Sequence, residues 1–399
     1  MPSLSSSIAT LRASVFAELQ PLLDARAAQG LSIAPLHIGD THLAPPTAAR
    51  FAHEAQTESD GSLHRYGNIA GEPSLRRALA HYNAQQGRGE YHPDTELLVS
   101  AGATHGLFCA ARAVLSPGDE VLVLSPYWPL SVGVLTSANA VPVEVALTQA
   151  LYADRAMDLS AVLAQHRTSR TRALYVTSPN NPDGYCYTAA QRRALADFAI
   201  AHDLWVLSDE VYADYSYTGA HGSLADEAQM RERTLRVFSF SKSHALAGAR
   251  VGAVLGPRDA IAAARRVSTH TVYNVPVISQ RVCANALTEG SLWVAHARAQ
   301  YLEACAIAVE AMSNTEIDFF VPDGGAYLFL DCTRVLRGRS LRALLSRAIE
   351  RGVLLAPGAA FGEGFERHAR LCFTSVDPAA LRSALGSLRE AIAHLSSTP

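Results

Sequence analysis

The chain has 399 residues, of which 49% are hydrophobic and 18% are charged, and its formal net charge is −3. This length and apolar content are sufficient to bury a large core and favour a division into two domains. The charge gives no electrostatic footprint for nucleic acid, and the sequence has neither a run of about 18 apolar residues nor a signal-peptide pattern, so we expect a cytoplasmic protein without a membrane anchor.

The first third of the chain is predicted to contain a turn suited to an anion. An amphipathic helix is expected over 72–86, because Pro73 stands at an early helical position where its missing N–H costs nothing. A strand, Leu97–Ser100, then runs into a helix expected from about Ala103 to Leu115. Free backbone N–H groups and the positive end of this helix would meet a phosphate at Gly102-Ala103-Thr104, with an ordinary strand-to-helix turn as the alternative interpretation.

Strands and helices alternate from about residue 95 to 256, which predicts a mostly parallel sheet covered on both faces. A strand over 172–177, a helix over 188–202 and a strand ending in an acid at 209 form one βαβ-type unit. The first of these strands runs into a turn, 178–184, that is dense in Pro, Asn and Gly. Because ligands of open α/β sheets bind beyond the carboxyl ends of the strands, we expect four side chains in one pocket. These are Asn181, Asp209, Tyr212 and Lys242.

Lys242 follows an apolar stretch, 236–240, that has the alternation of a strand, and a second short strand is expected over 250–255. The lysine therefore lies in a connection between strands. A lysine amine becomes a useful nucleophile toward an aldehyde when burial or cationic neighbours lower its pKa, and Arg250 and the apolar flanks could do both. A solvated loop lysine is the alternative interpretation, since lysines are mostly exposed.

The C-terminal part is predicted to be a smaller α+β unit. A long helix is expected over 294–313, and strands over 326–331, 353–356 and 370–375. The six cysteines lack the spacing of metal ligands, so we interpret them as buried thiols and expect no metal site. The predicted fold class is α/β, with a large domain built on a mostly parallel sheet flanked by helices and a smaller α+β domain.

Taken together, the motifs resemble the fold-type I enzymes that use pyridoxal 5′-phosphate, specifically the class I/II aminotransferase family. The motifs are Tyr66-Gly67 with Gly71, Ala101–Thr104, Pro126-Tyr127-Trp128, Ser178–Gly184, Ser208–Tyr212, Ser239–Lys242, Arg250, and Arg370 before Leu371-Cys372-Phe373. Each motif alone is common, whereas their joint order and spacing, which run nearly from end to end, are specific. The resemblance implies a large cofactor-binding domain over 48–280 and a small domain made of 1–47 together with 281–399.

The resemblance implies that one group of residues holds the cofactor ring. Lys242 would carry the cofactor covalently and, once freed, move a proton between the substrate and the cofactor. Asp209 would pair with the pyridine nitrogen, and Asn181 and Tyr212 would bond to the 3′-oxygen of the ring. Trp128 would stack on the ring, with Tyr127 as a rival. From the residues alone, Asn181 could instead be a turn residue, Tyr212 a packing tyrosine, and both aromatics core residues.

The resemblance assigns a second group to the cofactor phosphate. These residues are Ala103, Thr104, Ser239 and Arg250, with Ser241 as a further candidate and Tyr66 reaching over from the second subunit of a homodimer.

Substrate binding is implied for Gly39, Asn181 and Arg370. Arg370 matches the arginine that grips the substrate carboxylate through a bidentate fork, and a solvated strand-edge charge is the alternative. The chain departs from the common family pattern just after Gly39, at 40–46, which leaves the substrate's identity open. Some dicarboxylate-specific relatives carry a second cation near the phosphate turn, and Thr104 at that position favours a neutral or aromatic side chain.

The expected function is therefore amino transfer from an L-amino acid to a 2-oxo acid by a ping-pong mechanism in a homodimer. The alternative is a lyase, cyclase or decarboxylase of the same fold, because its ring-binding residues would be much the same. A ligand-sensing regulator is a third class, but it would need a DNA-binding module, and the first 45 residues contain few basic ones.

Overall fold

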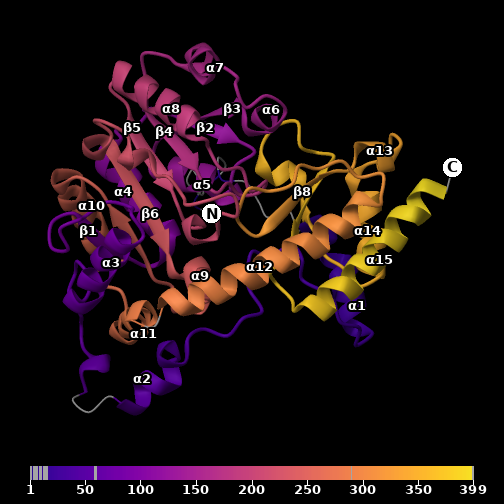
Figure 1. Ribbon diagram of the computed structural model, residues 1–399, viewed down its shortest axis with the longest axis horizontal. Helices are drawn as coiled ribbons and strands as arrows, with labels where there is room; N and C mark the ends of the chain where they lie inside the picture. Colours follow the sequence, from indigo (N-terminus) through magenta and orange to yellow (C-terminus); the bar gives the residue numbers. More distant parts are fainter. Residues whose placement is uncertain are drawn as a thin grey trace.

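A computed structural model describes residues 17–57, 61–288 and 290–397, together with residues 2, 8 and 11. A larger part is built on the strands β1 to β7 and a smaller part lies around β8, and the long helix α12, Gly290–Ser313, extends from one to the other (Figure 1). The described residues include no helix that is both long and apolar enough to cross a membrane.

The large sheet has seven strands in the order β1-β7-β6-β5-β4-β2-β3. Neighbouring strands are parallel, except that β7 runs antiparallel to both β1 and β6. Every residue of β2 and β6 is buried, which is typical of parallel strands covered on both faces. The prediction of a mostly parallel sheet is confirmed. The strands are β1 (Leu97–Ser100), β2 (Glu120–Ser125), β3 (Val141–Ala146), β4 (Thr171–Thr177), β5 (Trp205–Asp209), β6 (Thr234–Ser239) and β7 (Gly252–Leu255).

Helices cover both faces of this sheet. On one face, Leu107 of α4, Leu135 of α5 and Ile261 of α10 pack in one apolar cluster with the strands. On the other face, Leu163 of α7 and Leu195 of α8 pack in a second apolar cluster with strand residues such as Leu174. The predicted helices over 72–86, 103–115 and 188–202 are confirmed to within one residue at each end. The helices are α2 (Phe51–Thr57), α3 (Pro73–Gln85), α4 (Gly102–Val114), α5 (Pro129–Ser137), α6 (Thr148–Ala153), α7 (Leu159–His166), α8 (Ala189–Ala201), α9 (Phe240–Ser243), α10 (Arg258–Thr271) and α11 (Val277–Thr288).

The smaller part has a three-stranded antiparallel sheet in the order β8-β10-β9. The predicted strand over 353–356 is wrong in extent, because only Ala356 and Pro357 pair with β10, while Val353 forms an isolated bridge with Ala34. The strand predicted over 370–375 begins two residues earlier and ends at Cys372. The elements are α1 (Gln20–Ala28), β8 (Tyr327–Asp331), α13 (Thr333–Leu336), α14 (Leu341–Glu350), β9 (Ala356–Pro357), β10 (His368–Cys372) and α15 (Pro378–Ser397).

The apolar cores of the larger and the smaller part support a proposal for the domain boundary. Leu19 and Leu36 pack in the same cluster as residues of β8, β10 and α12 to α15, so we propose that the N-terminal segment belongs to the small domain. The predicted boundary at residue 280 falls inside α11, whose Val282 and Cys283 pack in the large-domain core with Leu79 of α3. We therefore propose to place the boundary after α11. Most of residues 1–16 lie outside the described residues.

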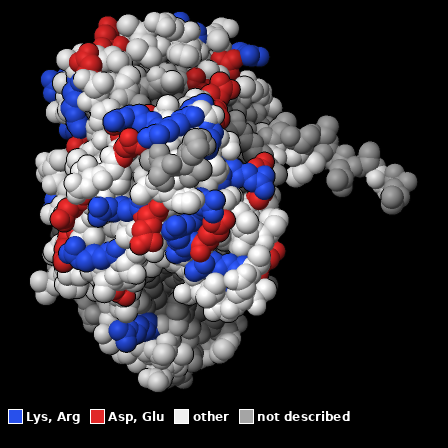
Figure 2. Space-filling view, turned by 90° about the vertical axis from the view of Figure 1, so that its right-hand side faces the viewer, with Lys and Arg blue, Asp and Glu red and all other residues white. Residues whose placement is uncertain are grey.

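The face of the small domain that carries α14 and α15 has intermixed positive and negative side chains (Figure 2). Ion pairs on this face join Arg347 to Glu350 at 2.8 Å, and Arg351, the residue after α14, to Glu390 at 3.7 Å. Exposed pairs of this kind contribute little to stability, typically about 0–1 kcal/mol each.

Candidate active site

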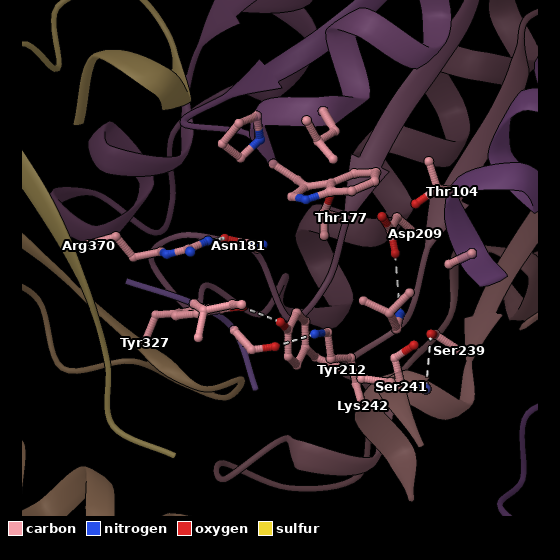
Figure 3. A pocket seen from close by; sticks show the side chains of 18 of the residues that line it. Thr104, Thr177, Asn181, Asp209, Tyr212, Ser239, Ser241, Lys242, Tyr327 and Arg370 are labelled. Carbon is pink, nitrogen blue, oxygen red and sulfur yellow. Dashed lines mark hydrogen bonds between the residues drawn. The ribbon is translucent and has the colours of Figure 1, made fainter. Parts of the chain in front are cut away.

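A cavity of about 490 Å³ lies where the carboxyl ends of β4, β5 and β6 face the small domain. Twelve of the thirteen predicted site residues line it, namely Gly39, Ala103, Thr104, Trp128, Asn181, Asp209, Tyr212, Ser239, Ser241, Lys242, Arg250 and Arg370. Figure 3 shows Arg370 at one end and Thr104 and Ser239 toward the other, with Tyr212 and Lys242 between them. One elongated cavity therefore joins the predicted carboxylate end to the predicted phosphate end.

Lys242 lies in the connection between β6 and β7, as predicted, on α9, a single helical turn that follows β6 directly. The turn is helical because Ser239 caps it: its side-chain oxygen accepts a hydrogen bond from the Ser241 backbone N–H at 3.2 Å, and Ser243 Oγ donates to the Ser239 carbonyl at 3.1 Å. Lys242 Nζ donates to the Gly39 carbonyl oxygen. These bonds aim the amine into the cavity.

The environment of Lys242 lowers the pKa of its amine. Burial lowers its pKa, and the positive charges of Arg370 and Arg250 lower it further, against the opposing effect of Asp40. A larger share of the side chain is then the unprotonated nucleophile. Lys242 is also the only lysine in the chain, since 33 of the 34 basic residues are arginines. It is therefore the only side chain that can present a primary amine.

Asp209 ends β5 and pairs in register with Thr177 of β4. Its carboxylate accepts hydrogen bonds from Tyr175 Oη at 2.9 Å and from the Val211 backbone N–H at 3.3 Å. Burial raises the pKa of Asp209 to about 6, although the Tyr175 bond acts in the opposite direction. A buried carboxylate is costly without a cationic partner, and a protonated ring nitrogen in the cavity would be such a partner.

The start of α4 forms the opposite end of the cavity. The first N–H groups of a helix have no partner within the helix, and Ala103 and Thr104 lie in this first turn. Gly102 has a φ of 77°, and a Cβ on it would lie 2.6 Å from Arg250 Nη2, so only glycine lets the guanidinium approach the helix start. Arg250 Nη1 is held by the Ala247 carbonyl at 2.9 Å and by Ser241 Oγ at 3.3 Å. Helix end and guanidinium together form an anion site.

The choice between the two neighbouring aromatics is decided by their burial. Tyr127 is only 2% exposed and packs in the large-domain core, where its backbone N–H donates to the Phe361 carbonyl at 2.9 Å. Trp128, immediately before α5, lines the cavity. Trp128 is thus available to contact a ring in the cavity, and Tyr127 is a core residue.

Arg370 lies on β10 and is buried, so it is not a solvated strand-edge charge. Its Nη1 donates to Asn181 Oδ1 at 2.8 Å and its Nη2 to the His37 carbonyl at 2.6 Å. Among the described residues, its Nε has no hydrogen-bond partner. A buried guanidinium with an N–H donor that has no partner is suited to bind a carboxylate. Such a carboxylate could bind Arg370 alongside Asn181.

Tyr327, at the start of β8, is a cavity residue that the sequence pattern does not single out. Its hydroxyl lies 2.5 Å from the hydroxyl of Tyr212. A Cβ on Gly39 would overlap this Tyr327 hydroxyl, so the glycine is needed for close packing rather than for an unusual backbone angle. Thr177 and Leu130 also line the cavity, and Thr177 could have been predicted, because it ends a strand beside Asp209.

Tyr66 is the predicted site residue that does not line the cavity. Its side chain is among the most exposed of the large hydrophobic residues, at 87%. Its ring meets Tyr273 edge-on, with 5.4 Å between the centroids. Within one chain, Tyr66 therefore has no contact with the phosphate end of the cavity.

The parallel sheet, the buried lysine and aspartate at its carboxyl edge, and the anion site at a helix start define a pyridoxal-phosphate enzyme of fold type I. Residues 32–388 match the family model described as aminotransferase class I and II. The chain belongs to this family.

Curated and solved relatives agree with this family. A probable aspartate/prephenate aminotransferase of Thermus aquaticus is 34% identical over 322 residues, which cover 78% of this chain and 79% of the relative. An arginine–pyruvate transaminase of Pseudomonas aeruginosa is 32% identical over 355 residues, 87% of each chain. A single mutant of the aspartate aminotransferase of Thermus thermophilus superposes with a TM-score of 0.89 at 29% identity, over 98% of this chain and 100% of that one.

Class I/II aminotransferases of this fold use pyridoxal 5′-phosphate, which is therefore the cofactor of this chain. When bound, it supplies an aldehyde for the amine and a ring that withdraws electrons from the substrate. The residues present fit it. Asp209 offers a buried carboxylate in need of a cation, Gly102 leaves room for Arg250 beside a helix start, and Lys242 offers an amine of lowered pKa.

Proposed function

We propose that this aminotransferase moves the amino group of an L-amino acid to a 2-oxo acid by a ping-pong mechanism. The observation that carries the proposal is the presence of Lys242, Asp209 and Arg370 on one cavity, with Arg370 bonded to Asn181. A carboxylate held by Arg370 orients the substrate so that its Cα–H bond faces the amine that removes the proton.

Each residue then has a defined task. Lys242 Nζ would take the proton from the substrate Cα, and its lowered pKa leaves a larger share of the amine unprotonated for this task than in a free lysine. Asp209 keeps the ring nitrogen protonated, because the cation relieves the cost of a buried carboxylate. Tyr212 stays a hydrogen-bond donor to the 3′-oxygen, because burial raises its pKa well above the usual value. Asn181 and Arg370 hold the substrate carboxylate, close to the backbone of Gly39.

We propose a substrate with a neutral, large apolar or aromatic side chain. Among the described residues that line the cavity, several outside the predicted cofactor-binding set are apolar or aromatic, namely Ile38, Pro129, Leu130 and Tyr327. His37 adds no cation at neutral pH, because burial and the charge of Arg370 lower its pKa to about 4. Thr104 is neutral as well. The names of the relatives point to acidic and basic substrates alike, so they do not decide the matter for this chain.

A half-reaction tests the reaction class. One amino acid added without a 2-oxo acid should change the cofactor spectrum once and release one equivalent of 2-oxo acid per site, and a different 2-oxo acid should then restore the spectrum. Aromatic and large aliphatic amino acids should convert the enzyme faster than aspartate does. Continued turnover of an amino acid without any acceptor, with release of ammonia or carbon dioxide, would favour the lyase or decarboxylase alternative instead.

We also propose that the active unit is a homodimer in which Tyr66 completes the phosphate site of the partner. The support is the exposure of Tyr66 and of the adjoining Tyr273 and Val272, which form an apolar patch outside the cavity. An isologous contact would bring each such patch against the second copy. The cytoplasmic location stays a prediction.

Tyr66→Phe should weaken cofactor binding roughly 10- to 150-fold, because a hydrogen bond to a charged acceptor contributes about 1.5–3 kcal/mol. Equilibrium dialysis of the cofactor measures this, and Tyr273→Phe is the matched control, since it removes the hydroxyl of the ring that Tyr66 contacts. Sedimentation at assay concentration should show a dimer. A fully active monomer, or equal losses in the two variants, would contradict the proposal.

A further inference from the structure

Tyr327 connects two parts of the cavity that otherwise have separate tasks. Its hydroxyl and that of Tyr212 are 2.5 Å apart, and both rings are nearly inaccessible to solvent. The rings meet edge-on at 79° with centroids 5.7 Å apart. The pair forms across the domains, since Tyr212 follows β5 of the large sheet and Tyr327 begins β8 of the small one.

The same ring supports the carboxylate-binding arginine. The guanidinium carbon of Arg370 lies 4.2 Å from the centroid of Tyr327, close enough for a cation–π contact. Phe361 offers a second ring, but at 5.0 Å. One side chain thus contacts both the tyrosine proposed to bind the cofactor 3′-oxygen and the arginine proposed to bind the substrate.

We propose that Tyr327 is a positioning residue that directs the Tyr212 hydroxyl toward the cofactor and holds Arg370 for the substrate. This inference rests on the proposed function. A tyrosine hydroxyl has one proton to donate and can accept further bonds. When Tyr212 donates its proton to the 3′-oxygen, the short contact requires Tyr327 to donate to Tyr212. That second bond polarises the Tyr212 hydroxyl and makes it a stronger donor.

The geometry around Tyr327 leaves its hydroxyl little choice of direction. Gly39 is packed against it so closely that a Cβ would overlap the oxygen, and the Gly39 carbonyl is already the acceptor for Lys242. Burial raises the pKa of Tyr327, although the nearby Arg370 charge acts in the opposite direction. The hydroxyl therefore remains a proton donor at neutral pH.

Two substitutions separate the two tasks. Tyr327→Phe keeps the ring under Arg370 and removes only the hydroxyl, whereas Tyr327→Leu removes both. Tyr217→Phe is the control, because its hydroxyl donates to the Gly325 carbonyl at 2.6 Å, two residues before Tyr327, without lining the cavity. The first readout is the pH midpoint of the absorbance change of the bound cofactor, which needs no substrate. The second is the split between kcat and KM, with thermal unfolding measured in parallel.

In Tyr327→Phe the midpoint should rise by a few tenths of a pH unit, because cooperative strengthening amounts to roughly 10–30% per bond and a weaker donor stabilises the anionic 3′-oxygen less. Its kcat should fall while KM stays within about twofold of wild type. Tyr327→Leu should show the same raised midpoint as Tyr327→Phe. It should also raise KM roughly 3- to 30-fold above the wild-type value, as expected for a lost cation–π contact. If the leucine variant does not fold, Tyr327→Met fills a similar space without an aromatic face and gives the same test.

An unshifted midpoint in Tyr327→Phe, an equal shift in Tyr217→Phe, or an unchanged KM without the aromatic ring would each overturn the inference. These results are distinguishable from a failure of the proposed function. In that case the wild-type enzyme itself would not complete the half-reaction, whatever the midpoint of its variants.

Discussion

Replacing Lys242 with alanine is expected to reduce amino transfer by at least about 10³-fold while the cofactor still binds without a covalent link. General acid–base catalysis by a positioned side chain typically contributes 10²- to 10⁴-fold, and this change also removes the amine that attacks the aldehyde. The contacts proposed to hold the phosphate and the ring do not depend on the amine, since they would come from Arg250, the start of α4 and Asp209.

The composition of the chain leaves one lysine side chain to which the cofactor can be attached in this experiment. Because Lys242 is the only lysine, borohydride reduction of the wild-type enzyme should fix the cofactor to one peptide, and the alanine variant should retain no side-chain adduct. Lys242→Arg is the matched control. It keeps a positive charge of similar reach but cannot supply a neutral amine, so it should be as inactive as the alanine variant.

Two results would contradict this assignment of Lys242. One is stoichiometric fixation of the cofactor in Lys242→Ala, which would place the covalent link on the N-terminal amine. The other is turnover within about tenfold of wild type. Loss of structure is a separate matter, and thermal unfolding excludes it; the helical turn of α9 is held by Ser239 and Ser243 rather than by the lysine.

The large sheet is predictable because its signals are local. The strand Thr171–Thr177, the helix Ala189–Ala201 and the strand Trp205–Asp209 each carry their own apolar pattern, and the ends of parallel strands meet at one edge. The direction of β7 is less local. Only residues 240–251 separate it from β6, and a connection of a dozen residues is at the limit of what a parallel crossover needs. Its antiparallel direction is therefore set by tertiary packing and not by a local sequence signal.

The small domain shows where local signals end. Val353 is a β-branched residue of the kind that favours strands, yet its backbone forms a bridge to Ala34, far away in the sequence. The pairing with β10 begins only at Ala356. Tyr327 carries no local signal for a site either. Its partner Tyr212 is 115 residues away, and only the closed fold brings the two hydroxyls together. In contrast, the fact that the chain has a single lysine can be read from a count of residue types, although the spacing of the motifs does not reveal it.

Replacing Arg370 with alanine is expected to lower kcat/KM roughly 30- to 5,000-fold, corresponding to about 2–5 kcal/mol for a buried charge pair that loses one partner. Cofactor affinity should stay near the wild-type value, because Arg370 contacts Asn181, His37 and Tyr327 rather than the start of α4. Arg250→Ala should do the opposite and weaken cofactor binding, since its guanidinium lies beside Gly102. The measurements are steady-state kinetics at saturating cofactor and equilibrium dialysis of the cofactor.

Two controls make the Arg370 result specific. Arg370→Lys keeps the positive charge without the planar fork, so it should recover only part of the loss. On the substrate side, a primary amine that lacks the carboxylate should react equally slowly with the wild type and with Arg370→Ala, because the guanidinium then has nothing to bind. If Arg370→Ala lost as much activity toward this amine as toward an amino acid, the arginine would act on the structure of the cavity, and the carboxylate contact would have to be sought elsewhere.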